Sequence, residues 1–148
     1  MAVSYEVAQK IINKKHLYCQ LIDADQFQRV AGEVMLPDAT STRYSDRKII
    51  NWDGVDLNFS SAADMAKYFA NRFKNFQRIH TISPPSLEQV GLDEVNAVFI
   101  LQYQYGPKGS DAGKSLTGGG YYHERFVRKG EDWFLKDMKV YQTYDIEI

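Results

Sequence analysis

The feature that most constrains the fold of this chain is a single change in its hydrophobic period. In the first part, apolar residues recur at three- and four-residue steps, which places them on one face of a helix; they are Val7, Ile11, Ile12, Tyr18, Cys19 and Ile22. In the last third, Val95, Ala97, Phe99, Leu101 and Tyr103 alternate with their neighbours, as strand residues do. Because helices and strands are segregated along the chain, the sequence predicts an α+β fold with antiparallel strands.

Two shorter helices are expected between these regions. Asp23 or Asp25 can cap the first of them, and Pro37 would end it. Its apolar face would hold Phe27, Val30, Ala31 and Val34. Ser61 and Asp64 have the spacing of a capping box, which predicts the start of another helix. The buried stripe of that helix would hold Met65, Phe69, Phe73 and Phe76.

The remaining segments are interpreted as strands and loops. Residues 35–59 are rich in turn signals and weakly β, and residues 78–82 form a short strand that Pro84 and Pro85 end. Residues 106–120 are a polar, glycine-rich loop that can act as a lid. Two strands, 121–128 and 133–144, then form a hairpin.

Length and composition limit the class of protein. The 148 residues are enough for one domain, expected to span residues 1–148. Eighteen basic against nineteen acidic side chains argue against a nucleic-acid partner. There is no apolar run of about 18 residues and no signal-peptide core, so we expect a soluble, cytoplasmic protein without a membrane partner. Aromatic residues are 14% of the chain, which suits a lined apolar cavity.

Three common kinds of site have weak support. The glycines of Gly109–Ser115 are one residue too close for a phosphate-binding loop, and the segment lies between strands. His16, His80 and His123 are far apart, so no metal site is expected. No G-x-S-x-G elbow of a serine hydrolase is present.

Two titratable residues have both a structural and a chemical interpretation. His80 lies between apolar residues of a strand, where it is either a core histidine bonded to a carbonyl or a general acid–base. Asp23 either caps a helix or places a carboxylate in an apolar site that orients a histidine. His123 shares one strand face with Tyr121 and Arg125; the arginine favours the outer face, but the sequence does not decide which face points inward.

Three stretches form a pattern that extends over nearly the whole chain: residues 17–27, residues 76–82 and residues 120–135. In these stretches the chain resembles the SnoaL-like group of the nuclear transport factor 2-like superfamily, which includes scytalone dehydratase, ketosteroid isomerase and small polyketide cyclases. The resemblance implies a cone, in which a curved antiparallel sheet wraps around the N-terminal helices and leaves an apolar pocket. The motifs are more specific for the fold than for the reaction.

By position, Asp23 and His80 match the aspartate and one active-site histidine of the dehydratase. The resemblance therefore implies that His80 removes a proton next to a carbonyl while Asp23 holds it. Substrate-binding candidates, by location, are Tyr18, Tyr44, Tyr122 and His123. The chain departs from the dehydratase at Ile22, where that enzyme has a tyrosine. It also lacks a clear second catalytic histidine, because His123 falls several residues late.

The leading hypothesis is a lyase or isomerase of the dehydratase or cyclase type that needs no cofactor. It would act by general acid–base catalysis on a small hydrophobic, oxygenated molecule such as a polyketide or terpenoid. The alternative is a non-catalytic ligand-binding or protein-interaction protein of the same fold. The resemblance also implies a homodimer that forms through the outer face of the sheet.

Overall fold

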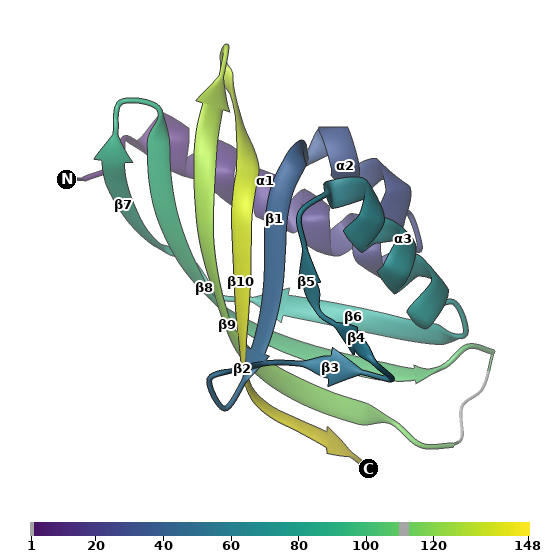
Figure 1. The fold of residues 1–148 in the computed structure, drawn as a ribbon. Coiled ribbons are helices and arrows are strands. Elements are labelled where there is room, and N and C mark those ends of the chain that lie inside the picture. The colour runs from purple at the N-terminus through teal and green to yellow at the C-terminus, as the bar shows by residue number, and fades with distance from the viewer. Residues whose placement is uncertain (1, 110–112) are drawn as a thin grey trace.

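The computed structural model describes residues 2–109 and 113–148 (Figure 1). Its helical elements are α1 (Tyr5–Asp23), the one-turn 3-10 helix η1 (Phe27–Arg29), α2 (Val30–Glu33) and α3 (Ala62–Arg72). Its strands are β1 (Met35–Ser45), β2 (Lys48–Ile49), β3 (Asn51–Trp52), β4 (Val55–Asp56), β5 (Asn58–Phe59), β6 (Phe76–Ile82), β7 (Ser86–Gly91), β8 (Glu94–Pro107), β9 (Leu116–Lys129) and β10 (Asp132–Glu147).

Eight strands form one curved sheet that does not close. Its main order is β2-β1-β10-β9-β8-β6, with β5 paired to β1 and β7 paired to β8. All neighbours are antiparallel except β1 and β10, which run parallel. Figure 1 shows the long strands bending around the helices, which gather on one side of the sheet. The predicted α+β fold with a curved sheet around N-terminal helices is therefore confirmed.

The core lies between α1 and the inner face of the sheet. Alternate residues of β8 are buried there, from Val95 to Leu101, and they pack with Ile11, Tyr18, Cys19, Leu21 and Ile22 of α1. On the outer face Ile100 is 49% exposed. The apolar face of α1 and the apolar face of β8 therefore pack against each other in one layer, as the sequence predicts.

The helix ends are partly as expected. Ser61 caps α3 and its hydroxyl accepts a hydrogen bond from the backbone N–H of Asp64 at 3.2 Å. Phe76, however, is not on the buried stripe of α3. The helix ends at Arg72, and Phe76 begins β6 with 40% of its surface exposed.

Three further expectations need correction. Neither aspartate caps the short helix that follows α1, because the residue before η1 is Gln26 and its side chain makes no capping bond. Pro37 does not end the short helix, because α2 ends at Glu33 and Pro37 lies within β1. The first part of the segment expected to be weakly β is thus a strand of 11 residues. The expected loop 106–120 is shorter, because residues 106–107 belong to β8 and residues 116–120 belong to β9. Residues 110–112 lie outside the described residues, so the prediction of a lid stays a prediction.

Candidate functional site

The site forms where the C-terminus of α1 meets the edge of the sheet. Strand β6 is the last strand of the main sheet order, and its inward residues face α1. Arg78 of β6 is buried and donates hydrogen bonds to the backbone carbonyl of Ile22 and to the Asp25 carboxylate, the latter at 2.7 Å. Asp25 adopts a left-handed conformation with φ of 59°. These bonds fix the end of α1 against β6.

Asp23, the last residue of α1, binds His80 twice. Its Oδ2 accepts the backbone N–H of His80 at 2.9 Å, and its Oδ1 lies 2.6 Å from the ring Nδ1. A carboxylate only accepts hydrogen bonds, so we assign the ring proton to Nδ1. Nε2 is then unprotonated, and its lone pair accepts a long hydrogen bond, 3.4 Å, from the hydroxyl of Tyr105. The Asp23 side chain thus fixes the position of the His80 backbone and determines which ring nitrogen carries the proton.

The electrostatic surroundings keep His80 neutral. Burial lowers the pKa of His80 below its ordinary value of 6.5, and the positive charges of Arg43 and Lys15 lower the pKa further. The hydrogen bond and negative charge of Asp23 raise it but do not reverse the shift. A neutral imidazole with an unprotonated Nε2 can accept a proton at neutral pH, which is the requirement for a general base.

A cavity of about 510 Å³ lies next to this pair. It is lined by Arg43, Ile50, Trp52, Arg72, Phe73, Phe76, Tyr103, Tyr105, Leu116, Gly119, Val140, Gln142 and Asp145. His80 does not line the cavity itself. Its ring lies against Tyr105 and Tyr103, with ring centroids 5.9 Å and 6.3 Å away. Tyr105 therefore stands between the imidazole and the open volume.

The two cavity tyrosines are hydrogen-bond donors. The hydroxyl of Tyr103 donates to Asp145 at 2.7 Å. Burial raises the pKa of Tyr105 to about 12, and burial together with the Asp145 hydrogen bond raises the pKa of Tyr103 well above its ordinary value. Both stay protonated at neutral pH. The single proton of Tyr103 is engaged by Asp145, so Tyr105 is the tyrosine that can donate to a substrate oxygen.

Sequence reasoning missed both cavity tyrosines and Arg43. Tyr103 belongs to the alternating series that begins at Val95, and Tyr105 continues that series by one more step. The alternation therefore places these tyrosines on the inner face of the strand, but the sequence did not show which end of the strand lines a cavity.

Two predicted substrate-binding tyrosines lie inside the cone and are not among the residues that line the cavity, although Val140, the cross-strand partner of one of them, does line it. Tyr18 and Tyr122 are buried with their rings nearly perpendicular and 6.3 Å apart. The Lys15 ammonium lies over both rings, at 4.0 Å and 3.3 Å, and pairs with Glu124 at 2.8 Å. The structure thus gives these tyrosines a position around a buried ion pair.

The other two predicted substrate-binding residues lie on the outer face. Tyr44 stacks on Tyr141 with ring centroids 5.1 Å apart, and His123 contacts the same ring at 5.0 Å. The alternation of β9 points Tyr122 inward, and His123 points outward as a result. The structure brings Asp23 and His80 together, and it places Tyr44 and His123 across the sheet from the cavity.

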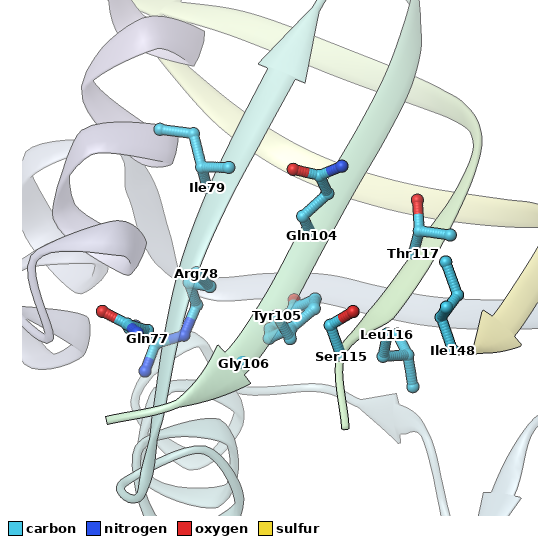
Figure 2. Close-up of a pocket in the computed structure, with 10 residues that line it drawn as sticks. All are labelled: Gln77, Arg78, Ile79, Gln104, Tyr105, Gly106, Ser115, Leu116, Thr117 and Ile148. Atoms are coloured by element: carbon cyan, nitrogen blue, oxygen red, sulfur yellow. The ribbon is translucent and has the colours of Figure 1, made fainter. Parts of the chain in front are cut away.

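A second hollow, of about 450 Å³, lies at the outer face of the sheet. Figure 2 shows Ile79 of β6, Gln104 of β8 and Thr117 of β9 side by side across three adjacent strands. Since Ile79 points outward and its neighbour His80 points inward, this hollow lies on the opposite side of the sheet from the Asp23–His80 pair.

Among residues 2–109 and 113–148, no group of three or more His, Cys, Asp or Glu side chains is placed to hold a metal ion. Over the same residues, no helix is both long and apolar enough to cross a bilayer.

Comparison with known proteins gives one relative at substantial identity and several shared folds. A sequence profile of the SnoaL-like domain matches residues 4–139. A Gibberella zeae protein named "Probable cyclase FGR4" is 36% identical over 145 residues, which cover 97% of this chain and 96% of the relative.

Two solved structures share the fold at low identity. One, from Novosphingobium aromaticivorans and provisionally named scytalone dehydratase, has a TM-score of 0.76 at 13% identity and covers 95% of this chain and 86% of its own. The other is the hexachlorocyclohexane dehydrochlorinase LinA-type3 of Novosphingobium barchaimii, with a TM-score of 0.70 at 16% identity over 97% and 88% of the two chains.

Proposed function

The chain belongs to the SnoaL-like family, and from this premise we propose that it is a lyase or isomerase of the dehydratase or cyclase type. It acts by general acid–base catalysis and uses no bound cofactor. The observation that carries the proposal is the Asp23–His80 pair, whose neutral imidazole directs its unprotonated Nε2 toward the Tyr105 hydroxyl at the cavity wall.

The reaction begins with proton removal. Nε2 of His80 accepts a proton from a carbon next to a carbonyl, and the C–H electron pair becomes the C=C bond of an enolate. Tyr105 donates a hydrogen bond to the oxygen that gains the charge. Asp23 stabilises the imidazolium that forms, through the hydrogen bond at Nδ1.

Two outcomes balance the second half of the reaction. In a dehydratase, the enolate expels a hydroxyl group that takes the proton from His80 and leaves as water. In a cyclase, the enolate carbon attacks a second carbonyl, whose oxygen takes that proton. Two of the structural neighbours are named as a dehydratase and a dehydrochlorinase, and both of these activities are eliminations.

The cavity favours a small hydrophobic, oxygenated substrate such as a polyketide or terpenoid. Trp52, Phe73 and Ile50 supply an apolar lining, and the tyrosines supply a few directed polar groups. The name of the Gibberella zeae relative, a cyclase, is consistent with such a substrate.

The position of Tyr105 supports a second candidate, a non-catalytic ligand-binding protein. If the Tyr105 ring stays between His80 and the ligand, Nε2 cannot reach a carbon atom. Proton exchange distinguishes the two candidates. The protein is incubated in D₂O with a panel of cyclic ketones and 1,3-diketones, and loss of the α-proton signal is followed by NMR.

We expect catalysed exchange by the natural chain and by the control His16→Gln, which changes an exposed histidine of α1. His80→Gln should lose about 10²-fold or more of the exchange rate. Ligand binding without exchange, or equal exchange by His80→Gln, would favour the binding protein.

We also propose that the protein forms a homodimer through the outer face of the sheet. Ile79, Ile100 and Tyr121 are exposed there, and such a patch favours association. Size-exclusion chromatography with light scattering should give a dimer for the natural chain and a monomer for Ile100→Lys. A monomeric natural chain at micromolar concentration would contradict this proposal.

A further inference from the structure

Arg43 is a cation at the wall of the cavity. Its side chain lines the cavity, and its guanidinium carbon lies 4.3 Å from the centre of the Phe69 ring. Its Nε is buried and has no hydrogen-bond partner among residues 2–109 and 113–148. No ion pair joins Arg43 to an acidic side chain in the part of the chain that the structure describes.

The other cations near the site each have a partner. Lys15 pairs with Glu124 at 2.8 Å, and Arg78 pairs with Asp25 at 2.7 Å. Arg72, which also lines the cavity, pairs with Asp53 at 2.8 Å. A half-buried guanidinium without an acceptor loses hydration without compensation, unless a ligand supplies the missing acceptor.

The backbone holds Arg43 in this place. Its N–H donates to the carbonyl of Leu57 at 2.9 Å, and its carbonyl accepts from the N–H of Ile50, also at 2.9 Å. The neighbour Tyr44 points outward and stacks on Tyr141. The strand therefore keeps the guanidinium on the cavity side, and its contact with the Phe69 ring restrains it further.

The charge of Arg43 acts on several groups of the site. It lowers the pKa values of Tyr105, Tyr103, Tyr18 and His80. Burial has the larger effect on each group: it raises the pKa of the three tyrosines and lowers the pKa of His80. The carboxylate that lines the same cavity, Asp145, is exposed to water and accepts the Tyr103 hydroxyl. Water screens the charge of Asp145 more than that of Arg43.

From this arrangement we infer that the cavity binds an anion: an apolar or aromatic body that carries one ionised oxygen group, which the guanidinium of Arg43 receives. The ionised group is a carboxylate or the ionised enol of a 1,3-dicarbonyl compound, both of which offer two oxygens to the fork of an arginine. This inference rests on the proposed function in taking the cavity as the substrate site, and it narrows the substrate class to monoanions.

Matched ligand pairs test the inference by isothermal titration calorimetry. The first pair is 2-naphthoate and the neutral 2-naphthamide, which have nearly the same shape. The second pair is 2-acetylindane-1,3-dione, whose enol is ionised at neutral pH, and 2-acetyl-2-methylindane-1,3-dione, which has no acidic C2–H and stays neutral. We expect the natural chain to bind at least one anion about tenfold or more tightly than its neutral partner. The pair with the larger preference identifies the ionised group.

Variants then assign the preference to a residue. Arg43→Gln should remove it and leave the affinity for the neutral ligand nearly unchanged. Arg47→Gln removes the same charge from an exposed turn nearby and should keep the preference. Arg43→Lys keeps the charge without the fork and should keep part of the preference, which covers the case in which Arg43→Gln does not fold.

Three results would overturn the inference: equal binding of anion and neutral partner in both pairs, no binding of either anion at millimolar concentration, or a preference that Arg72→Gln removes and Arg43→Gln keeps. The variant His80→Gln separates the inference from the proposed function. It should keep the anion preference even if it shows that His80 has no role in catalysis.

Discussion

Asp23→Asn is the sharpest test of the His80 geometry. The carboxylate of Asp23 accepts two N–H groups, one from the backbone of His80 at 2.9 Å and one from its ring at 2.6 Å. An asparagine offers one acceptor oxygen and one donor NH₂ in the same space, so one of the two N–H groups must lose its acceptor.

The magnitudes decide which bond survives. An unsatisfied backbone N–H in this site costs about 1–3 kcal/mol, whereas an imidazole can move its proton to the other nitrogen. We therefore expect the oxygen of the substituted amide to keep the backbone bond and its NH₂ to donate to Nδ1 of His80. The ring proton then lies on Nε2, toward Tyr105, and the lone pair of Nε2 is lost. A tautomer change of this kind in a serine-protease triad costs about 10⁴-fold in kcat, so we expect a loss of about 10³- to 10⁴-fold here.

Kemp elimination measures this loss without knowledge of the natural substrate. In that reaction a base removes the C3–H proton of 5-nitrobenzisoxazole, the N–O bond breaks, and the isoxazole ring opens to a coloured phenolate. Values of kcat/KM are compared for the natural chain, Asp23→Asn and the control Asp38→Asn, which changes an exposed carboxylate on β1. Urea unfolding of each variant confirms that the fold is retained. If folded Asp23→Asn lost less than about tenfold in kcat/KM, the tautomer argument would be refuted.

Other measurements test the surroundings of the pair. The acid limb of the pH profile of kcat/KM should have its midpoint below 6.5, because burial lowers the pKa of His80 and activity needs the neutral ring; a midpoint at or above that value would contradict the assignment. Gly118→Ala should destabilise the fold by about 1–3 kcal/mol in urea unfolding, since its new Cβ would overlap the ring of Tyr103. The double variant with Tyr103→Ala should recover most of that loss, and an additive double variant would disprove the clash. Lys15→Met should cost about 3–5 kcal/mol, because it leaves Glu124, 0% exposed, without its partner. Adding Glu124→Leu should restore stability, and a Lys15→Met variant as stable as the natural chain would show that the pair has no such role.

The alternation of apolar residues was enough to predict the α+β class, because periods of 3.6 and 2 correspond to different backbones. The same alternation failed where tertiary contacts set the ends of elements. Pro37 lies in β1 between Met35 and Thr40, where the register of β1 with its parallel neighbour β10 is irregular, and a residue without an N–H is tolerated at such a place. Phe76 is not part of the buried stripe of α3, because α3 ends at Arg72 and Phe76 is the first residue of β6.

The candidate site divides in the same way. The sequence by itself determined that Asp23 ends a helix, that His80 lies on a strand among apolar residues, and that Tyr103 belongs to an alternating strand, since these are local properties of spacing. Only the tertiary structure decided that the carboxylate and the imidazole meet across 57 positions of sequence, that the tyrosines face the open volume, and that Arg43 lines the same volume. Such contacts depend on how far the sheet curves around the helices, and that curvature is set by the packing of the whole chain.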